Sequence, residues 1–289
     1  MNYWEVSLMD CQIKITDNKA VWKIQAALAL IFLLNPFLGV LSTLFFVFVS
    51  KEKSMAFYLV IILTLFMWCL QSTRSFHLGE PSDWAGNYYY NFHNAAITDT
   101  FTYLFFTTKE YAWQAFNLIG YYLFDGDFLS YANFIVALTY MFTFAAIYKF
   151  WNYIQADPRF LVASLCLFAF VTEVNGICNN LLRQQFAMSM MLYAIIERCT
   201  NGRILYPLLV ISFFTHTMTG FFIPFLFIRL GKKASFRFYI YIVLGFGLLY
   251  ILFTNLSIFS SSSFYAFQRL ATASNAYALK DIIQPSAVY

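Results

Sequence analysis

An arginine inside an apolar stretch is the first residue in this chain with a clear capacity for chemistry. Arg183 lies within residues 179–188, where a charge facing lipid would cost roughly 3 kcal/mol or more on insertion scales. The guanidinium therefore needs an anionic partner or a water-filled cavity. Other ionisable residues lie beside or within further apolar runs: Arg74, Asp83, Glu110, Glu173 and His216. We expect a polar interior within a membrane bundle, and the function should lie there.

The residues around Arg183 suggest a phosphate site. If a helix begins here, Asn180, Arg183 and Gln184 fan across one face. A fixed guanidinium with flanking amides suits a diphosphate, because the arginine fork can hold phosphate oxygens in a bidentate manner. The alternative is a structural ion pair with Glu173 or Glu110. We favour the phosphate site, because ionisable residues within membranes are usually functional.

The connector after the second apolar run carries a second set of polar and aromatic residues. If a helix begins near Asp83, this carboxylate lies one turn from the amide of Asn87. By the same spacing Tyr88 lies one turn from Phe92. Carboxylate, amide and aromatic rings together suit carbohydrate, whose hydroxyls need acceptors and whose ring faces stack on aromatic side chains. The alternative is an aromatic belt at the membrane interface.

Two further residues are candidates for acid–base chemistry. His216 can act as a general base, as a donor to phosphate, or as an inert hydrogen-bonded core group. Glu110 is a candidate base just before an amphipathic segment, although an exposed pair with Lys109 is equally consistent with the sequence. Neither position decides between these alternatives alone.

The composition places the chain in a bilayer. It is 61% hydrophobic, 22% aromatic and 11% charged, against roughly 25% charged residues in soluble domains. Because each span with its connector uses about 30 residues, we predict one integral membrane domain over residues 1–289. Within it, residues 1–25 form a polar N-terminal segment and residues 257–289 a polar external tail. The net charge of +4 comes from Lys and Arg in short loops, so nucleic-acid binding is not implied.

No metal or other cofactor is expected. The five cysteines include no CxxC pair, and they lack metal-ligand spacing with the three histidines. No cluster of carboxylates offers a metal site either.

The apolar pattern predicts an all-α polytopic membrane bundle of roughly seven to nine transmembrane or re-entrant helices. Seven runs resemble spans, at about 26–49, 55–71, 128–150, 160–172, 181–196, 204–228 and 238–256. Pro36, after Asn35, interrupts the first run and is expected to divide it into two short helices. Residues 111–124 form an amphipathic segment, predicted to be an interfacial or re-entrant helix or a short cavity-lining span.

The basic connectors raise a difficulty at residues 204–228. By the positive-inside rule the cytoplasmic connectors are those with Lys51 and Lys53, Lys149 and Arg159, Arg198 and Arg203, and Arg229, Lys232, Lys233 and Arg237. Residues 204–228 then have cytoplasmic connectors at both ends and cannot cross once. A re-entrant hairpin with His216 at its outward tip resolves this. The alternative is one long tilted helix with His216 packed inside.

Three short motifs occur in order along the chain. The first is an Arg ending an early span, then Ser-Asp, Tyr and Phe. The second is Asn, Arg-Gln and Ala on a later helix, and the third is a Phe-His-Thr/Ser element, which this chain fits loosely. The matching residues are Arg74, Ser82, Asp83, Tyr88 or Tyr89, Phe92, Asn180, Arg183, Gln184, Ala187, Phe214, Thr215, His216 and Thr217. Together they resemble the EpsG-type branch of the Wzy-like bacterial polysaccharide polymerases.

This resemblance implies a multi-pass protein of the bacterial inner (cytoplasmic) membrane that makes O-antigen, capsule or exopolysaccharide. Such a glycosyltransferase joins undecaprenyl-diphosphate-linked oligosaccharide repeat units on the outer face, with undecaprenyl diphosphate as the leaving group. Flippase and chain-length regulator proteins are then candidate partners. Relative to that family we expect a shortened C-terminus, because the chain stops at Tyr289 after a Ser-rich tail.

The residues supply roles consistent with that activity. Arg183 and Arg74 would hold the diphosphate, and Asp83, His216 or Glu110 would deprotonate the acceptor hydroxyl. The further candidates for substrate binding are Tyr88, Tyr89, Asn180 and Gln184.

Other functions compete with the polymerase. A transporter or flippase for lipid-linked sugars would use Arg183 and His216 as substrate or proton sites, but the apolar pattern lacks a convincing inverted repeat. A membrane acyltransferase acting on glycans would need its histidine on the cytoplasmic side or at mid-membrane. A structural partner in an envelope assembly would use the polar helix face with Asn180, Arg183 and Gln184 only for helix packing.

Overall fold

The computed structural model describes residues 18–50, 53–74, 84–97, 110–171 and 181–227. Within these ranges every regular element is helical, as predicted. The chain divides into two compact units, residues 1–229 and 230–289, and all described residues belong to the first. Several predicted features lie outside the described residues: Asp83, Asn180, Glu173, the span at 238–256 and the polar tail from 257.

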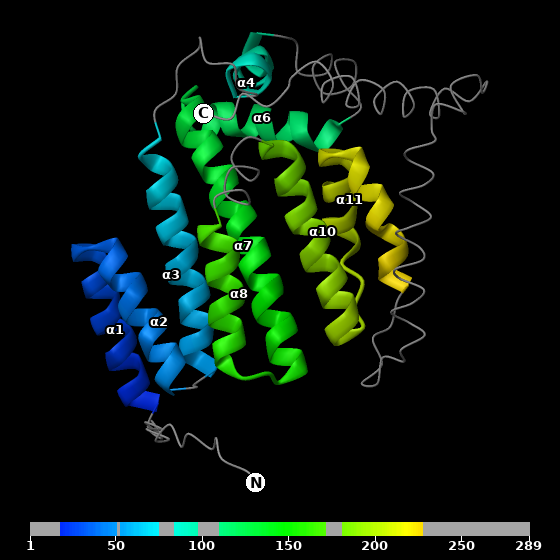
Figure 1. The fold of residues 1–289 in the computed structure, drawn as a ribbon. Coiled ribbons are helices and arrows are strands. Elements are labelled where there is room, and N and C mark those ends of the chain that lie inside the picture. Colours follow the sequence, from blue (N-terminus) through cyan, green and yellow to red (C-terminus); the bar gives the residue numbers. More distant parts are fainter. Residues whose placement is uncertain (1–17, 51–52, 75–83, 98–109, 172–180, 228–289) are drawn as a thin grey trace, which may run out of the picture. The chain divides into compact units, whose positions relative to one another are not determined.

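The first apolar run forms two helices, α1 (Asn18–Leu34) and α2 (Pro36–Ser50), which confirms the predicted break. Asn35 joins them, and its side-chain oxygen accepts a hydrogen bond from the Leu38 amide at 3.1 Å. The two helices pack against each other (Figure 1). Gly39 makes the contact possible, since a Cβ there would lie 2.4 Å from the Cα of Phe32.

The centre of the bundle contains the helices best suited to crossing a membrane. By length and composition, α3 (Lys53–Ser72) and α7 (Phe128–Ile154) could each span a bilayer. They pack on each other, and α7 also packs on α10 (Leu182–Asn201) and α8 (Pro158–Phe170). Further spans among the shorter apolar helices stay a prediction.

The outward surface of the helices is strongly apolar. Trp22 is 70% exposed, Leu34 88% and Phe160 69%, and many other large apolar side chains in the described part of the chain are similarly open. A soluble monomer rarely exposes such extensive apolar surface. The surface is what a bilayer would cover, in agreement with the predicted membrane class.

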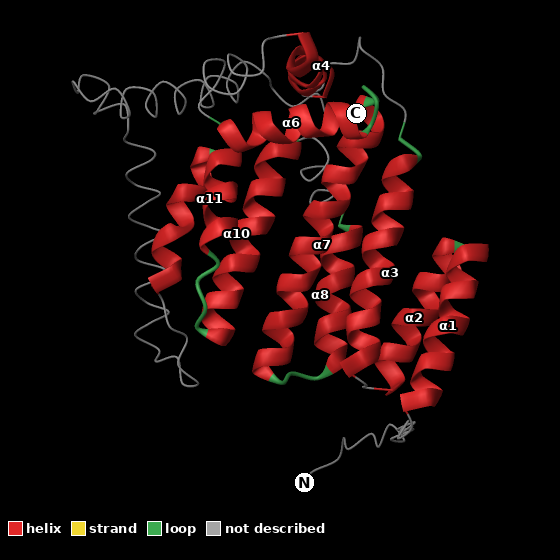
Figure 2. Cartoon of the chain, turned by 180° about the vertical axis from the view of Figure 1, so that it is seen from behind, coloured by secondary structure: helices red, strands yellow, loops and turns green. Residues whose placement is uncertain are grey.

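The predicted amphipathic segment is helix α6 (Tyr111–Leu123), which runs across the ends of α7 and α10 (Figures 1 and 2). Its inner face is polar, because Gln114 and Asn117 are each 1% exposed. Tyr131 of α7 donates a hydrogen bond from its hydroxyl to the Asn117 side-chain oxygen at 3.0 Å. Leu123, by contrast, is 67% exposed. The helix therefore buries amides and exposes apolar residues.

Two short elements precede α6 along the chain. The π-helix η1 (Trp84–Tyr88) continues into α4 (Tyr89–Ile97), and α4 packs on α6. The helix expected to start near Asp83 is thus present from Trp84 onward.

The apolar run at 204–228 folds as a hairpin, which confirms the predicted break. Its legs are α11 (Tyr206–Thr215) and the 3₁₀ helix η2 (Thr217–Phe227), joined at His216 in extended conformation. Both legs pack on α10 and on each other. At the open end of the hairpin, the Arg198 side chain of α10 donates to the backbone oxygen of Leu226 at 3.1 Å. The end of η2 therefore lies near the C-terminal end of α10, and α11 begins shortly after that end.

Candidate functional site

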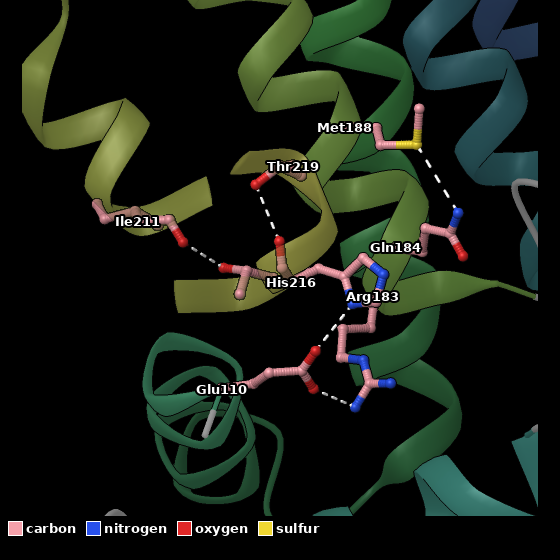
Figure 3. A network of polar contacts seen from close by, with 8 residues as sticks. Glu110, Arg183, Gln184, Met188, Ile211, His216 and Thr219 are labelled. Carbon is pink, nitrogen blue, oxygen red and sulfur yellow. Dashed lines mark hydrogen bonds and ion pairs between the residues drawn. The ribbon is translucent and has the colours of Figure 1, made fainter. Parts of the chain in front are cut away.

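Three separate elements bring together Glu110, Arg183 and His216. Glu110 immediately precedes α6, Arg183 lies in the first turn of α10, and His216 is the joint of the hairpin. One carboxylate oxygen of Glu110 lies 2.5 Å from an Arg183 terminal nitrogen. The other lies 2.8 Å from His216 Nδ1 (Figure 3). We call these three residues the carboxylate-bridged triad.

The triad is partly buried and keeps unused hydrogen-bonding capacity. The side chains of Glu110 and His216 are each 14% exposed, and that of Arg183 is 24% exposed. The Arg183 Nε is buried and has no hydrogen-bond partner among the residues that the structure describes. An unpaired donor on a buried cation is costly, so it is a natural contact for an arriving anion.

The contact with Glu110 orients the histidine. A carboxylate accepts hydrogen bonds, so Nδ1 bound to Glu110 carries the proton in the neutral imidazole. Nε2 is then the nitrogen with the free lone pair. This arrangement gives a base whose proton-accepting atom is distinct from the atom that anchors it.

Hydroxyl groups stabilise the backbone where the hairpin breaks. Thr215 donates from its side chain to the Ile211 oxygen at 2.7 Å, and Thr219 donates to the His216 oxygen at 2.9 Å (Figure 3). Ser212 reaches across and donates to the Ala187 oxygen of α10 at 2.7 Å. The Ile211 and Ala187 oxygens lie inside helices, whereas the His216 oxygen lies at the break, where a carbonyl group within a membrane needs a partner. These hydroxyls therefore hold His216 beside α10.

The hydroxyl residues were not among the predicted site residues. Ser212, Thr215 and Thr219 follow one another at helical spacing through the predicted break. That spacing was the available signal for side chains that satisfy a broken backbone.

The other predicted substrate residues lie elsewhere. Arg74 stacks its guanidinium over the Trp84 ring at 4.3 Å. Tyr88 is 5% exposed and packs edge-on against Trp113 at 5.8 Å between ring centroids. Tyr89 also belongs to a ring cluster, since it packs against Phe128 at 5.7 Å. These ring contacts of Tyr88 and Tyr89 belong to the packing between η1, α4, α6 and α7.

Gln184, next to Arg183, does not contact Glu110. Its amide nitrogen lies 4.0 Å from the sulfur of Met188, one turn along α10 (Figure 3). Of the polar residues predicted to share one face of this helix, Arg183 is paired with Glu110, and Asn180 lies outside the described residues.

An apolar cavity of about 220 Å³ lies against another part of α10. Its lining comes from α7, α8, α10 and η2, and includes Thr143, Phe168, Gln185, Ser189 and Phe222. None of the three triad residues lines it. We place the chemistry at the triad, where the ionisable groups meet, and not in the cavity.

Comparison with models of protein families gives a match over most of the chain. The model of the EpsG family matches residues 57–281, which is well over half of the chain and includes the whole triad. This confirms the resemblance found in the motifs. No curated protein and no solved structure matches the chain.

Proposed function

The chain belongs to the EpsG family, and on that premise we propose that it is a polysaccharide polymerase. The family and the exposed apolar helices indicate a membrane protein concerned with polysaccharide. The proposed reaction joins undecaprenyl-diphosphate-linked oligosaccharide repeat units at the outer face of the inner membrane. Undecaprenyl diphosphate is the leaving group.

The observation that supports this proposal is the single carboxylate shared by a cation and a base. Glu110 contacts Arg183 and His216 at the same time, across 106 residues of sequence in the case of His216. Transfer of a sugar from a diphosphate needs a base for the acceptor and a positive charge for the departing group. Arg183 and His216 supply these two groups side by side.

In the proposed reaction His216 acts as the general base. The acceptor hydroxyl oxygen forms a bond to the anomeric carbon of the donor, while the hydroxyl proton passes to Nε2. The bond from that carbon to the diphosphate oxygen breaks and leaves its electron pair on the diphosphate. Glu110 stabilises the imidazolium that forms, since its carboxylate already contacts Nδ1.

Arg183 takes up the negative charge of the leaving diphosphate. Its buried Nε has no partner in the described structure, so it can donate to a phosphate oxygen without giving up an existing bond. A second donor becomes available if the diphosphate displaces Glu110 from the terminal nitrogen. A planar guanidinium suits this role better than an ammonium, because two donors point the same way.

The remaining predicted residues belong to the proposal as tests. Arg74 is a second candidate contact for the diphosphate, and Asp83 an alternative base that lies outside the described residues. Asp83→Ala should abolish long-chain glycan if that residue is the base. Normal polymer from this variant would leave His216 as the base.

The experiment uses a strain that lacks this gene, complemented with the wild type, Arg183→Ala or Arg183→Lys. Surface polysaccharide is separated by length on a gel, and the protein in the membrane is quantified by immunoblot. We expect the wild type to restore a ladder and both variants to leave a single repeat unit on its lipid. A normal ladder from Arg183→Ala would refute the site, and an unchanged ladder without the gene would point to a transporter or a glycan-modifying enzyme.

A further inference from the structure

We propose that Arg198 is a positioning residue for the hairpin that carries His216. This inference rests on the proposed function for its catalytic meaning, but its structural part can be tested separately. Arg198 lies in the last turn of α10, far along that helix from Arg183. Fifteen residues separate the two arginines, which is roughly 22 Å along a helix.

The Arg198 side chain joins two segments at the open end of the hairpin. Its Nε donates to the Leu226 oxygen at 3.1 Å, near the end of η2. One terminal nitrogen donates to the oxygen of Gly202, the residue that ends α10 just before the first leg. Gly202 has φ of +71°, the left-handed conformation that lets the chain turn sharply into α11. One guanidinium thus ties the exit of the hairpin to its entrance.

The fork geometry of arginine explains why this residue suits the position. The two carbonyl groups come from backbone segments 24 residues apart and need donors in different directions. A guanidinium presents several fixed N–H groups, whereas an ammonium is a compact point charge on a flexible stem. The contact with Leu226 is partly buried and the contact with Gly202 is exposed, so the Leu226 contact is the one expected to fix the geometry of the hairpin.

The acidic residue next to Arg198 is already paired with another cation. Glu197, next to it, forms an ion pair with Lys149 of α7 and accepts a hydrogen bond from Asn201 at 2.8 Å. Among the described residues, no ion pair involves Arg198. In the described part of the chain, its hydrogen bonds go to the backbone oxygens of Leu226 and Gly202.

We expect the contacts of Arg198 at the open end to affect the position of His216 at the tip. The reason is that both legs are short and both pack on α10. The legs have 10 and 11 residues, and Ser212 holds the first leg to Ala187 of α10. Arg183 belongs to that helix as well, so α10 carries both the diphosphate contact and the hairpin attachment. Releasing the open end should shift His216 relative to Glu110 while leaving Arg183 in place.

The first test follows the position of the tip without relying on activity. The rings of Tyr111 in α6 and Phe214 near the tip lie 5.8 Å apart. Cysteines replace both residues in a full-length chain whose five native cysteines are changed to alanine, and a short thiol-reactive crosslinker joins them in membranes. Arg198→Gln should lower the crosslinking yield at least about twofold, and Arg198→Lys should restore part of it because an ammonium can reach one carbonyl.

The matched control is Arg159→Gln. This change also removes one arginine from the predicted cytoplasmic side, but Arg159 contacts Asp157 and the ring of Phe48 and touches no part of the hairpin. Its crosslinking yield should equal that of the parent. An unchanged yield in Arg198→Gln would overturn the positioning role, whatever the protein catalyses.

The second test measures polymerisation by purified protein in vesicles with the lipid-linked repeat unit of the host strain. Arg198→Gln should lower kcat per folded molecule by about 10- to 100-fold, as expected for a small misplacement of a base. KM should stay within about twofold, since Arg183 does not move. A raised KM with unchanged kcat, or lower crosslinking with normal kinetics, would refute the inference. Lower crosslinking with an inactive wild type would instead refute the polymerase and leave the positioning intact.

Discussion

Each end of α10 lies beside a glutamate paired with a cation, but the two pairs have different surroundings. At the start, Glu110 is shared between Arg183 and His216, and the buried Arg183 Nε has no partner within the described ranges. At the other end, Glu197 pairs with Lys149 and accepts from Asn201, and its side chain is 7% exposed. Both are acid–base pairs within a helical bundle. Only the first combines a titratable base with an unsatisfied donor.

Under the proposed function, this difference separates an ion pair that receives a substrate from one that supports the fold. A structural pair is valuable when each buried group is satisfied, because an unpaired charge is costly. A site for an anionic substrate must leave some capacity unused until the substrate arrives. We therefore expect substitutions of Arg183 to affect catalysis, and substitutions in the Lys149–Glu197 pair to affect folding.

The largest effect should come from removing the base. His216→Gln keeps a polar side chain at the hairpin tip but removes the basic nitrogen. We expect kcat to fall by about 10²- to 10⁴-fold, the usual contribution of a general base. Polymerisation in vesicles measures this, with thermal unfolding in detergent as the control for folding. Activity within twofold of wild type would remove His216 from the mechanism.

Arg183→Lys should have the next largest effect. It keeps the positive charge beside Glu110 but loses the second parallel donor. We expect about a 10²-fold lower kcat, comparable to losing one donor to developing negative charge. The same kinetic assay measures it. A lysine variant as active as wild type would mean that only charge is needed there, and that the two ends of α10 differ less than their geometry suggests.

Lys149→Gln should instead lower the stability of the protein and leave kcat nearly unchanged. It leaves Glu197 buried beside Asn201 without its cation, so stability should fall by about 1–3 kcal/mol while kcat per folded molecule changes little. Unfolding by denaturant in mild detergent measures the loss. Adding Glu197→Gln should recover much of it, because the uncompensated charge is then removed. A large fall in kcat at unchanged stability would contradict the structural assignment of this pair.

The smallest effect concerns a helix cap outside both ion clusters. Asp127 accepts hydrogen bonds from the Leu129 and Ser130 amides at the start of α7. The Ser130 hydroxyl, its strongest partner, holds the pKa of this carboxyl below its ordinary value of 3.8. Asp127→Ala should cost about 0.5–2 kcal/mol.

The sign of the pH dependence follows from the lowered pKa of Asp127. Its contribution to stability is complete above the unfolded pKa and is lost as the pH falls through the lower folded pKa. Thermal unfolding between pH 6 and pH 3 should therefore show the wild type and Asp127→Ala converging at the acid end. A gap that widens toward low pH would contradict the cap.

Features encoded within one segment could be predicted from the sequence. Proline after Asn35 predicted the division of α1 from α2, because it cannot continue the hydrogen-bond ladder. Basic connectors on both sides of residues 204–228 predicted a hairpin with His216 at its joint. Both follow from local chemistry and the length of a bilayer crossing, so neither needed knowledge of the tertiary contacts.

Pairings between distant segments could not be predicted in the same way. Glu110 was one of two alternative partners for Arg183, and its contact with His216 depends on how α6 lies across α10. Tyr88 has the chemistry of a sugar contact, but whether it faces a ligand or the core depends on which face α6 covers. The structure packs it on Trp113, as edge-on packing between helices can bury even a tyrosine.

The short legs of the hairpin bear on how the protein is made. With 10 and 11 residues, neither leg is long enough to be recognised as a span during synthesis, which takes about 20 apolar residues. The insertion machinery meets the two legs as one continuous apolar stretch of about that length. A stretch recognised as one unit must bend at His216 before its two legs can pack on α10 as they do in the structure. The contact between His216 and Glu110 depends on that bend, so a variant that keeps residues 206–227 as one straight helix should lose it.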